Sequence, residues 1–492
     1  MLEVVDRRGG SCATLSWRLG GRAALFVTLL AVAVPCRPVA AETLEQAMSA
    51  AYLINPVLNA ERARLRAIDE EVSVAKSGLR PFIGGTADYS YVHQNSERAT
   101  GRRGGGGAID FGPAGLTTDG TTHPHGYAFQ LSQPLFEGFQ NLNAIRQAKS
   151  IVQSARESLR IVEQTILLDA STAYVNVVRD QAVVRLREND VKVLTEQLKA
   201  TRDRFDVGEV TRTDVAQAEA RRSEALATLA GAQANLKTSR AAYEQIVGHP
   251  PENLVAPPSI LNLLPRGLDE AMTLGDGENP IILASVYQEE ASLYAVEQIM
   301  GELLPNVSLE AQYEKRFDQS TSLPEIETTS VTGRVNVPFY QGGGVSARIR
   351  QAKETNNQLK KQVEDARLRV HADIIANWGI LQSSGPAITS AEAAVAANKI
   401  ALTGVREEEK VGQRTTLDVL DAQRELLNSQ IGLVSALRDR VVAEYSLYAA
   451  IGRMDAQTLG LSVPYYDPIE HYDIVKNKWL GLRPPVPPAV DE

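Results

Sequence analysis

The chain has almost no cysteine. Its two cysteines, Cys12 and Cys36, both lie in residues 1–41, a stretch that has the features of an export signal. Basic residues precede an apolar run over 23–34, and small residues end the stretch at Ala41, where we expect a signal peptidase to cleave. Without residues 1–41 no cysteine remains, which excludes a disulfide scaffold and any cysteine-based zinc or redox site.

Long apolar runs are also missing. The run over 23–34 spans about 12 residues, whereas a membrane-spanning helix needs about 20. No later segment stays apolar over about 18 residues, so an exported chain of this kind is either soluble or crosses a membrane as β-strands. The formal net charge is −9, and this acidic balance argues against a general nucleic-acid binder.

Patterns of reactive or metal-binding side chains are equally sparse. No nucleophile stands beside a base in a recognisable pattern. The glycines at 104–107 are not followed by the Lys-Ser/Thr of a phosphate-binding loop, and His123 and His125 lack an accompanying helical His-Glu pair. We therefore predict no enzymatic activity, no metal and no cofactor.

What the chain does contain is a repeat. VGEVTRTDVAQAEA at 207–220 returns as VGQRTTLDVLDAQR at 411–424, and PLFEGFQNLNAIRQAK at 134–149 returns as PFYQGGGVSARIRQAK at 338–353. The matched segments keep their order, which predicts a duplication within one fold. The spacing between copies shortens by 20 residues along the chain, which indicates an insertion in the first copy around 101–120, and we expect a flexible loop there.

Alternating polarity predicts two strands in each copy. Over 306–313 apolar and polar side chains alternate, and the same holds over 86–91, 127–132 and 330–337. A half-buried soluble sheet would alternate too, but two hairpins far apart in sequence cannot bury a core for a chain of this size. Apolar faces with aromatic residues are typical of outer-membrane strands. Four strands are too few to close a barrel, so several chains would have to combine.

Long helices account for most of the remaining sequence. Residues 141–206 contain no proline, and a helix of that length would span about 100 Å. Apolar side chains recur along it at spacings of three and four, which favours coiled-coil packing: Leu159, Val162, Ile166, Ala170, Ala173 and Val177. The following segment, 213–246, is rich in alanine, which lets neighbouring helices approach closely. A soluble coiled-coil rod would show the same spacing.

The matched segments divide the chain into two repeats, a linker and a tail. The first repeat, 42–251, has a helix, a β-hairpin at about 82–136, a long helix at about 140–206 and a helix at about 212–247. After a linker at 252–265, the second repeat, 266–453, has a helix, a β-hairpin at about 305–340, a long helix at about 344–410 and a helix at about 415–451. The tail, 454–492, is rich in proline, and we expect irregular packing followed by a disordered end.

From Leu44 to about Gly460 this organisation resembles the TolC family of outer-membrane efflux and secretion channels. The motifs that support the resemblance are the paired VG segments at 207–220 and 411–424, together with QPLFEGF and VPFYQGG after each β-hairpin. The resemblance implies a mostly α fold with membrane β, built from a duplicated helix–β-hairpin–helical-hairpin unit. It also implies a homotrimer whose 12-stranded outer-membrane β-barrel is continued by a 12-helix periplasmic coiled-coil tunnel, with the tail around its equator.

The resemblance also implies a place and partners. It predicts a passive exit duct in the cell outer membrane, in contact with outer-membrane lipid and extending into the periplasm. It predicts a periplasmic adaptor and an inner-membrane transporter of the RND or ABC type as partners, with no nucleic acid. The alternative is a soluble periplasmic coiled-coil adaptor or scaffold, but an adaptor usually has one helical hairpin between β-rich domains, whereas this chain has two.

The paired VG segments are predicted to be the turns of the two helical hairpins. Glycine permits the left-handed backbone that a helix end needs, and Thr211 or Thr213, and Thr415 or Thr416, can cap the next helix. In the related channels these tips form the tunnel entrance. The resemblance therefore implies adaptor contacts at the two tips, at Val207, Gly208, Thr211, Val411, Gly412 and Thr415.

Asp418 and Asp421 are the candidates for a gate. They lie three residues apart and share a helix face, so three copies would bring six carboxylates to one constriction, where they would favour protonation or cation binding. A solvated helix face is the alternative explanation. The first copy has Asp214 and Gln217 at the matching positions, so only the second hairpin carries the double carboxylate.

The resemblance also implies a latch that holds the tips closed. Arg414 is at the position of the family's linking arginine, and Thr213 and Asp214 are at those of its polar and acidic partners, which predicts an ion pair between Arg414 and Asp214. Glu409 occupies the position of the family's linking aromatic residue. A glutamate opposite Asp214 would repel it, so the second link of the latch is expected to be weak.

Overall fold

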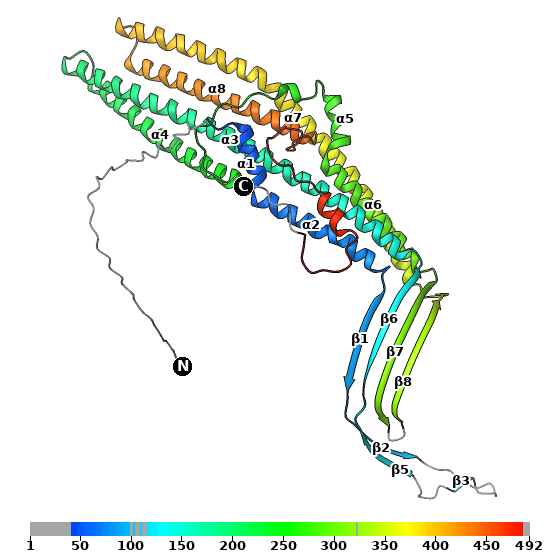
Figure 1. The fold of residues 1–492 in the computed structure, drawn as a ribbon. Helices are drawn as coiled ribbons and strands as arrows, with labels where there is room; N and C mark the ends of the chain where they lie inside the picture. Colours follow the sequence, from blue (N-terminus) through cyan, green and yellow to red (C-terminus); the bar gives the residue numbers. More distant parts are fainter. Residues whose placement is uncertain (1–40, 99–101, 104–108, 111–115, 321–322, 486–492) are drawn as a thin grey trace, which may run out of the picture. The chain divides into compact units, whose positions relative to one another are not determined.

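The computed structural model describes residues 41–98, 102–103, 109–110, 116–320 and 323–485. The predicted signal segment lies outside these residues except for Ala41, and so do the glycines at 104–107. The described chain is mostly helical, with two long helical hairpins and one four-stranded antiparallel sheet (Figure 1). None of the helices in the described ranges is both long enough and apolar enough to cross a membrane.

The two halves of the chain repeat the same order of elements. The first half consists of α1 (Leu44–Ile54), α2 (Pro56–Ser77), the strands β1 to β6, α3 (Gln140–Asp206) and α4 (Arg212–Val247). After the short 3₁₀ helix η1 (Leu261–Leu263), the second half consists of α5 (Leu268–Glu278), α6 (Pro280–Gly301), β7 (Asn306–Ser320), β8 (Leu323–Asn336), α7 (Gly344–Lys410) and α8 (Thr416–Ala450). Both long helices have 67 residues.

Each half starts with two helices, whereas the sequence predicts one. The break falls at Asn55 and Asn279, each of which precedes a proline that takes the first helical position. The Asn55 carboxamide oxygen accepts from the Val57 N–H at 2.9 Å, and its Nδ2 donates to the Ile246 carbonyl at 3.0 Å. Asn279 repeats this arrangement with the Ala450 carbonyl at 2.8 Å. Each asparagine therefore joins the start of one helix to the end of another, α2 to α4 and α6 to α8.

The four-stranded sheet joins the two halves. Its order is β1 (Phe82–Tyr89), β6 (His125–Glu137), β7 and β8, with all neighbours antiparallel and β6 paired to β7. In the register of the ladder, one row of apolar side chains crosses all four strands: Ile83, Leu131, Ala311 and Val331. Ile83 and Val331, at the two ends of this row, are each 70% exposed. The apolar face of the sheet is therefore largely uncovered in the single chain.

A flexible loop is expected in the insertion of the first half, but the residues of it that the structure describes lie in strands. β2 (Val92–Arg98) pairs with β5 (Leu116–Thr122), and β3 (Arg102–Arg103) pairs with β4 (Ile109–Asp110), so the described part of the insertion continues as paired strands. β5 is rich in threonine, and this β-branched residue favours extended backbone.

Helix α3 lies at the centre of the helical part. It packs against α1, α2, α4, α6 and α8, and the seam expected from the sequence is buried at Leu159, Ile166, Ala170, Ala173 and Val177. The linker also contacts α3 through Val255. The Tyr174 hydroxyl of α3 lies 2.7 Å from the carbonyl oxygens of Val255 and Glu42. Burial of this hydroxyl raises the pKa of Tyr174 to about 12.

The tail is more regular than the sequence predicts. It contains the helix α9 (Glu470–Val475), which lies beside α2 (Figure 1). Val475 is fully buried, and the Ser73 hydroxyl donates to its carbonyl oxygen at 2.6 Å. The contact with α2 therefore supplies order that the proline-rich sequence does not suggest. Residues 486–492, where a disordered end is expected, lie outside the described residues.

Candidate functional site

The two helical-hairpin turns have the same backbone. Gly208 has φ +82° and Gly412 has φ +78°, and a Cβ atom at either position would meet no other atom within 4 Å. Glycine is therefore required by the left-handed backbone rather than by close packing. Val207 and Val411 precede these glycines and are exposed, so both tips present an apolar side chain to solvent.

Each turn is closed by a capping box. Thr211 and Thr415 are the capping residues, whereas Thr213 and Thr416 lie inside the helices. The Thr415 hydroxyl accepts from the Asp418 N–H at 3.2 Å, and the Thr415 N–H donates to the Asp418 carboxylate at 2.9 Å. Asp214 forms the same bonds with Thr211 at 3.3 Å and 2.8 Å. The sequence repeat at the tips is therefore a repeat of reciprocal helix caps.

Asp418 consequently has a structural role that the gate hypothesis omits. The N–H and hydroxyl groups of Thr415 donate to its carboxylate, and together with nearby Arg414 they hold the pKa of Asp418 below the usual value. Within one chain this carboxylate is stabilised in its charged form. Protonation at a crowded constriction would have to overcome that preference.

Asp421 points toward a different partner. Its carboxylate lies 2.9 Å from Arg221 Nη2 of α4 and 3.8 Å from Arg424 of its own helix. The pair with Arg221 links the two hairpins. The two candidate gate residues therefore have separate partners in one chain, a helix cap for Asp418 and a cross-hairpin ion pair for Asp421.

The expected link between Arg414 and Asp214 is not formed in the described residues of one chain. Arg414 Nε lies 2.8 Å from Glu408, and this contact raises the pKa of Arg414. The Asp214 carboxylate accepts from Thr211. Both residues of the expected link therefore have a partner within their own hairpin.

Glu409 is held by Arg204, which the sequence motifs do not single out. Arg204 Nη1, in the last turn of α3, lies 2.8 Å from Glu409 Oε1, and the Thr416 hydroxyl lies 3.5 Å from the same oxygen. The Glu409 side chain is 11% exposed. A half-buried carboxylate in a last helical turn favours a cation nearby, and the RDRF sequence before the first turn supplies one.

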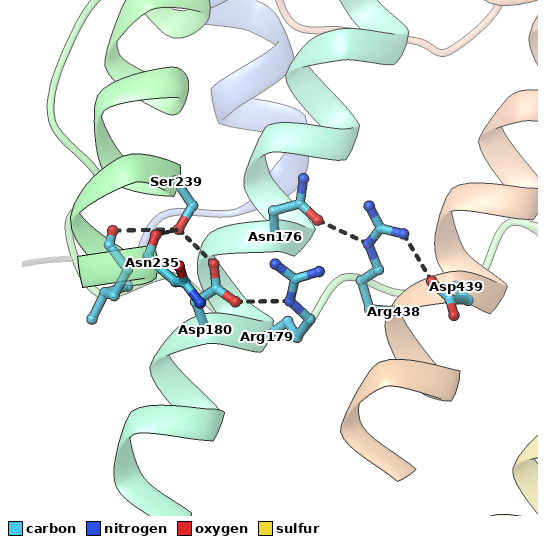
Figure 2. Close-up of polar contacts among 8 residues, drawn as sticks. Asn176, Arg179, Asp180, Asn235, Ser239, Arg438 and Asp439 are labelled. Atoms are coloured by element: carbon cyan, nitrogen blue, oxygen red, sulfur yellow. Dashed lines mark hydrogen bonds and ion pairs between the residues drawn. The ribbon is translucent and has the colours of Figure 1, made fainter. Parts of the chain in front are cut away.

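Farther from the tips, α3, α4 and α8 meet through further polar contacts (Figure 2). Arg438 of α8 donates through Nε to Asn176 of α3 at 2.8 Å. The Ser239 hydroxyl of α4 donates at 2.7 Å to Asp180, whose other oxygen lies 2.8 Å from Arg179 Nε. These contacts hold α4 against α3 within the first hairpin and join α8 of the second hairpin to α3.

The described residues contain no group of three or more His, Cys, Asp or Glu side chains that could hold a metal ion. The chemistry near the tips is instead that of helix caps and ion pairs between packed helices. Such an arrangement can position helix ends and set the charge around an opening.

Comparison with known proteins assigns the chain to a family. The model of the outer membrane efflux protein family matches residues 47–249 and 276–453. The chain belongs to this family. The match confirms the resemblance noted from the paired motifs, and it ends before the tail.

Two relatives and one solved structure illustrate how far the similarity to other outer membrane efflux proteins extends. "Outer membrane efflux protein BepC" of Brucella suis biovar 1 is 42% identical over 446 residues, which cover 90% of this chain and 92% of BepC. "Outer membrane protein TolC" of Escherichia coli K12 is 25% identical over 440 residues, which cover 85% of this chain and 84% of TolC. The crystal structure of the CmeC outer membrane channel of Campylobacter jejuni matches with a TM-score of 0.74 at 15% identity, covering 89% of each chain.

These similarities agree on the class of protein. The relatives are outer membrane proteins, and the chain is an outer membrane efflux protein with the fold of the channel structures. Nothing in them supports a soluble periplasmic adaptor or scaffold.

Proposed function

We propose that three copies of the chain form a passive exit duct through the outer membrane. Each copy would contribute β1, β6, β7 and β8 to a 12-stranded barrel, and its two helical hairpins to a 12-helix tunnel that extends into the periplasm. A periplasmic adaptor and an inner-membrane RND or ABC transporter would open and drive the duct. The observation that supports this most directly is the exposed apolar face of the four-stranded sheet.

The four-stranded sheet of a single chain would not be stable in lipid by itself. Its edge strands, β1 and β8, each have one neighbour in the described sheet, so one side of each leaves backbone groups unpaired. Unpaired backbone groups are costly in hydrocarbon, so membrane sheets close on themselves. Pairing β8 of one copy with β1 of the next would satisfy both edges, and three copies would supply strands for a closed barrel. The apolar row from Ile83 to Val331 would then face the acyl chains.

The helical hairpins would form the entrance at the other end. Their tips expose Val207 and Val411, which offers an adaptor two apolar contacts per chain. The second hairpin would bring Asp418 and Asp421 of each copy toward a narrow opening. The caps and ion pairs that hold these residues would then determine how easily the opening widens.

The cargo class follows from a relative. BepC is named as an efflux protein and is 42% identical to this chain over most of its length. We therefore propose efflux, rather than protein secretion, as the main use of the duct. A deletion strain should become more sensitive to toxic small molecules while its secreted proteins stay unchanged, and the reverse result would favour secretion.

Two substitutions on opposite faces of β8 can test whether the sheet forms part of a membrane barrel. Val331→Arg places a charge on the apolar face of β8, and Thr332→Arg places the same charge on the opposite face. An arginine facing the middle of the bilayer costs about 2–4 kcal/mol, so Val331→Arg should reduce barrel assembly while Thr332→Arg should not.

Two measurements would report the result. Light scattering of the purified protein in detergent should give a trimer, and planar bilayers should show channels. A monodisperse monomer, or recovery of the protein in the soluble periplasmic fraction, would contradict the proposal.

A further inference from the structure

The tail places an exposed apolar patch beside α2. Residues 476–483, here called the tail patch, read KNKWLGLR and contain three basic residues and no acidic one, in a chain of net charge −9. Trp479 is 66% exposed, Leu480 is 90% exposed, and Leu482 is fully exposed. Large apolar side chains clustered in this way usually mark an interaction surface. The family match ends at residue 453, so it assigns no role to this segment.

The patch is held against α2 by defined contacts. Lys76 Nζ donates to the Lys476 carbonyl at 2.7 Å, and Arg80 Nη1 donates to the Lys478 carbonyl at 2.9 Å. The Arg80 guanidinium also lies 4.6 Å from the centre of the Trp479 ring. These contacts fix the position of Trp479 while leaving most of its surface uncovered.

A second set of contacts holds the tail against α2 at Ser73 and Asp69, about one and two helical turns before Lys76. His471 Nδ1 lies 3.0 Å from the fully buried carboxylate of Asp69, and Ser73 binds the Val475 carbonyl. The tail therefore follows α2 toward its C-terminal end over more than one helical turn.

The patch itself is a closed loop. Lys478 Nζ donates to the Arg483 carbonyl at 2.9 Å, and Gly481 has φ +121°, a conformation that other residues rarely adopt. Between these ends, Leu480 and Leu482 project away from the protein.

The location of the patch relates it to the membrane. Its contact residue Arg80 lies between the end of α2 at Ser77 and the start of β1 at Phe82. Phe82 and Ile83, the first residues of β1, are exposed. If β1 enters the outer membrane, as proposed above, the patch lies where the helices leave the membrane on the periplasmic side.

We propose that the tail patch docks on the periplasmic leaflet of the outer membrane and binds anionic phospholipid. Trp479, Leu480 and Leu482 would enter the boundary between headgroups and acyl chains, where tryptophan is favoured. Lys478 and Arg483 would lie at the lipid phosphates, because basic residues next to a membrane are attracted to anionic headgroups. This inference rests on the proposed duct and adds a lipid contact outside its barrel.

Charge argues against a second copy of the chain as the occupant. The helices near the sheet are arranged in the order α2, α3, α6, α7, so α7 is the other outer helix at this level. Its first turns carry Arg348, Arg350 and Lys353 before the first acidic residue, Glu354. Arg348 is ion-paired with Glu302, so Arg350 and Lys353 are the basic groups that would meet the patch. Packing this end of α7 on the tail patch would bring basic groups together.

The two tryptophans that remain after cleavage at Ala41 allow a direct test. Trp378 lies on α7 and packs partly buried against the main core, so Trp378→Phe leaves Trp479 as the only reporter. The full chain would be reconstituted in vesicles of phosphatidylglycerol and phosphatidylcholine with bromine on the acyl chains near the headgroup. Trp479 fluorescence should fall about twofold relative to unbrominated vesicles, because the ring would lie at the interface. The matched Trp479→Phe variant, which keeps Trp378, should be quenched much less.

Charge reversal tests the headgroup contact. In the Trp378→Phe background, Lys478→Glu with Arg483→Glu should remove most of the quenching. Reversal of an exposed lysine of α7, Lys399→Glu, should leave it unchanged. Equal quenching in vesicles of phosphatidylcholine alone would overturn the preference for anionic lipid.

Flotation of the vesicles separates failure of this inference from failure of the duct. Protein that floats with vesicles but shows no quenching of Trp479 would overturn the lipid contact and leave the duct standing. Protein that does not float would overturn the duct. An unquenched Trp479 with a blue-shifted spectrum, together with trimer loss in Trp479→Ala, would show that a second copy covers the patch and would also overturn the inference.

Discussion

Arg204 of α3 and Glu409 of α7 form an ion pair, with 2.8 Å between Nη1 and Oε1, that joins the two hairpins next to their turns. From the sequence, Glu409 is expected to weaken the closed tips, because the family has an aromatic residue at this position and Asp214 is the expected neighbour. In the structure the glutamate has its own cation, and Asp214 belongs to a helix cap. The cross-link at this position is thus ionic in this chain.

Removing this link should open the tips. Ion pairs of this exposure contribute up to about 1 kcal/mol each, so three copies would favour the closed state by up to about 3 kcal/mol. Arg204→Ser should therefore raise the single-channel conductance in planar bilayers. Arg202→Ser is the matched control, because Arg202 pairs with Glu219 of the same hairpin. Equal conductance in the two variants would show that the link does not hold the tips.

The proposed gate role of Asp418 and Asp421 is best tested by replacing both aspartates with asparagine. Asp418→Ala would also remove the cap on Thr415, so Asp418→Asn with Asp421→Asn is the cleaner change. It should reduce cation selectivity, measured as a reversal potential, and weaken block by trivalent cations, which prefer charged oxygen ligands. Asp214→Asn makes the same change in the matching cap of the first hairpin and should leave both properties unchanged. Wild-type cation selectivity in the double variant would show that Asp418 and Asp421 lie on an ordinary solvated helix face and do not form a gate.

A buried carboxylate in α3 should make stability depend on pH. Burial raises the pKa of Asp190 above its ordinary value of 3.8, against the opposing effects of Arg187 and Gln423. The folded state therefore holds this proton more tightly than the unfolded state. As a result, the contribution of Asp190 favours folding at low pH and is lost as pH rises from 3.8 through the folded pKa.

Asp190→Asn should remove that dependence. The variant should be more stable than wild type at neutral pH, and this advantage should shrink as pH falls toward 4. Thermal unfolding across this range would measure the difference. An advantage of constant size at every pH would mean that Asp190 has an ordinary pKa.

The two tip glycines should be intolerant of any side chain. Gly412→Ala forces alanine into left-handed backbone at a cost of about 1–2 kcal/mol. Gly404, inside α7, also has open space around it but is helical, so Gly404→Ala should stabilise by up to about 1 kcal/mol. Thermal midpoints should move in opposite directions, and a neutral Gly412→Ala would show that the tips rearrange freely.

Local sequence patterns predict the helices of this protein well, because the residues that start, continue and end a helix lie close together in the chain. The long helices begin and end near the predicted residues because apolar spacing, glycine and capping threonine act within one or two turns. The choice between Thr415 and Thr416 as cap could not be made from sequence, since both are near the turn and only one has its hydroxyl at the Asp418 N–H. The Asn-Pro breaks carry a clear local signal, and they show that a helix can stop without an irregular loop.

The sequence by itself determined the alternating strands and the two helical hairpins, because each depends on residues a few positions apart. It also determined the duplication and hence the family, because matched segments can be compared directly within the sequence. Only the tertiary structure decided which charged groups meet, since Arg204 and Glu409, or Arg221 and Asp421, are about 200 residues apart and several other partners of the right sign are available. It also decided that the tail lies along α2. That contact depends on the shape of a surface assembled from distant segments, and no pattern in the tail itself encodes it.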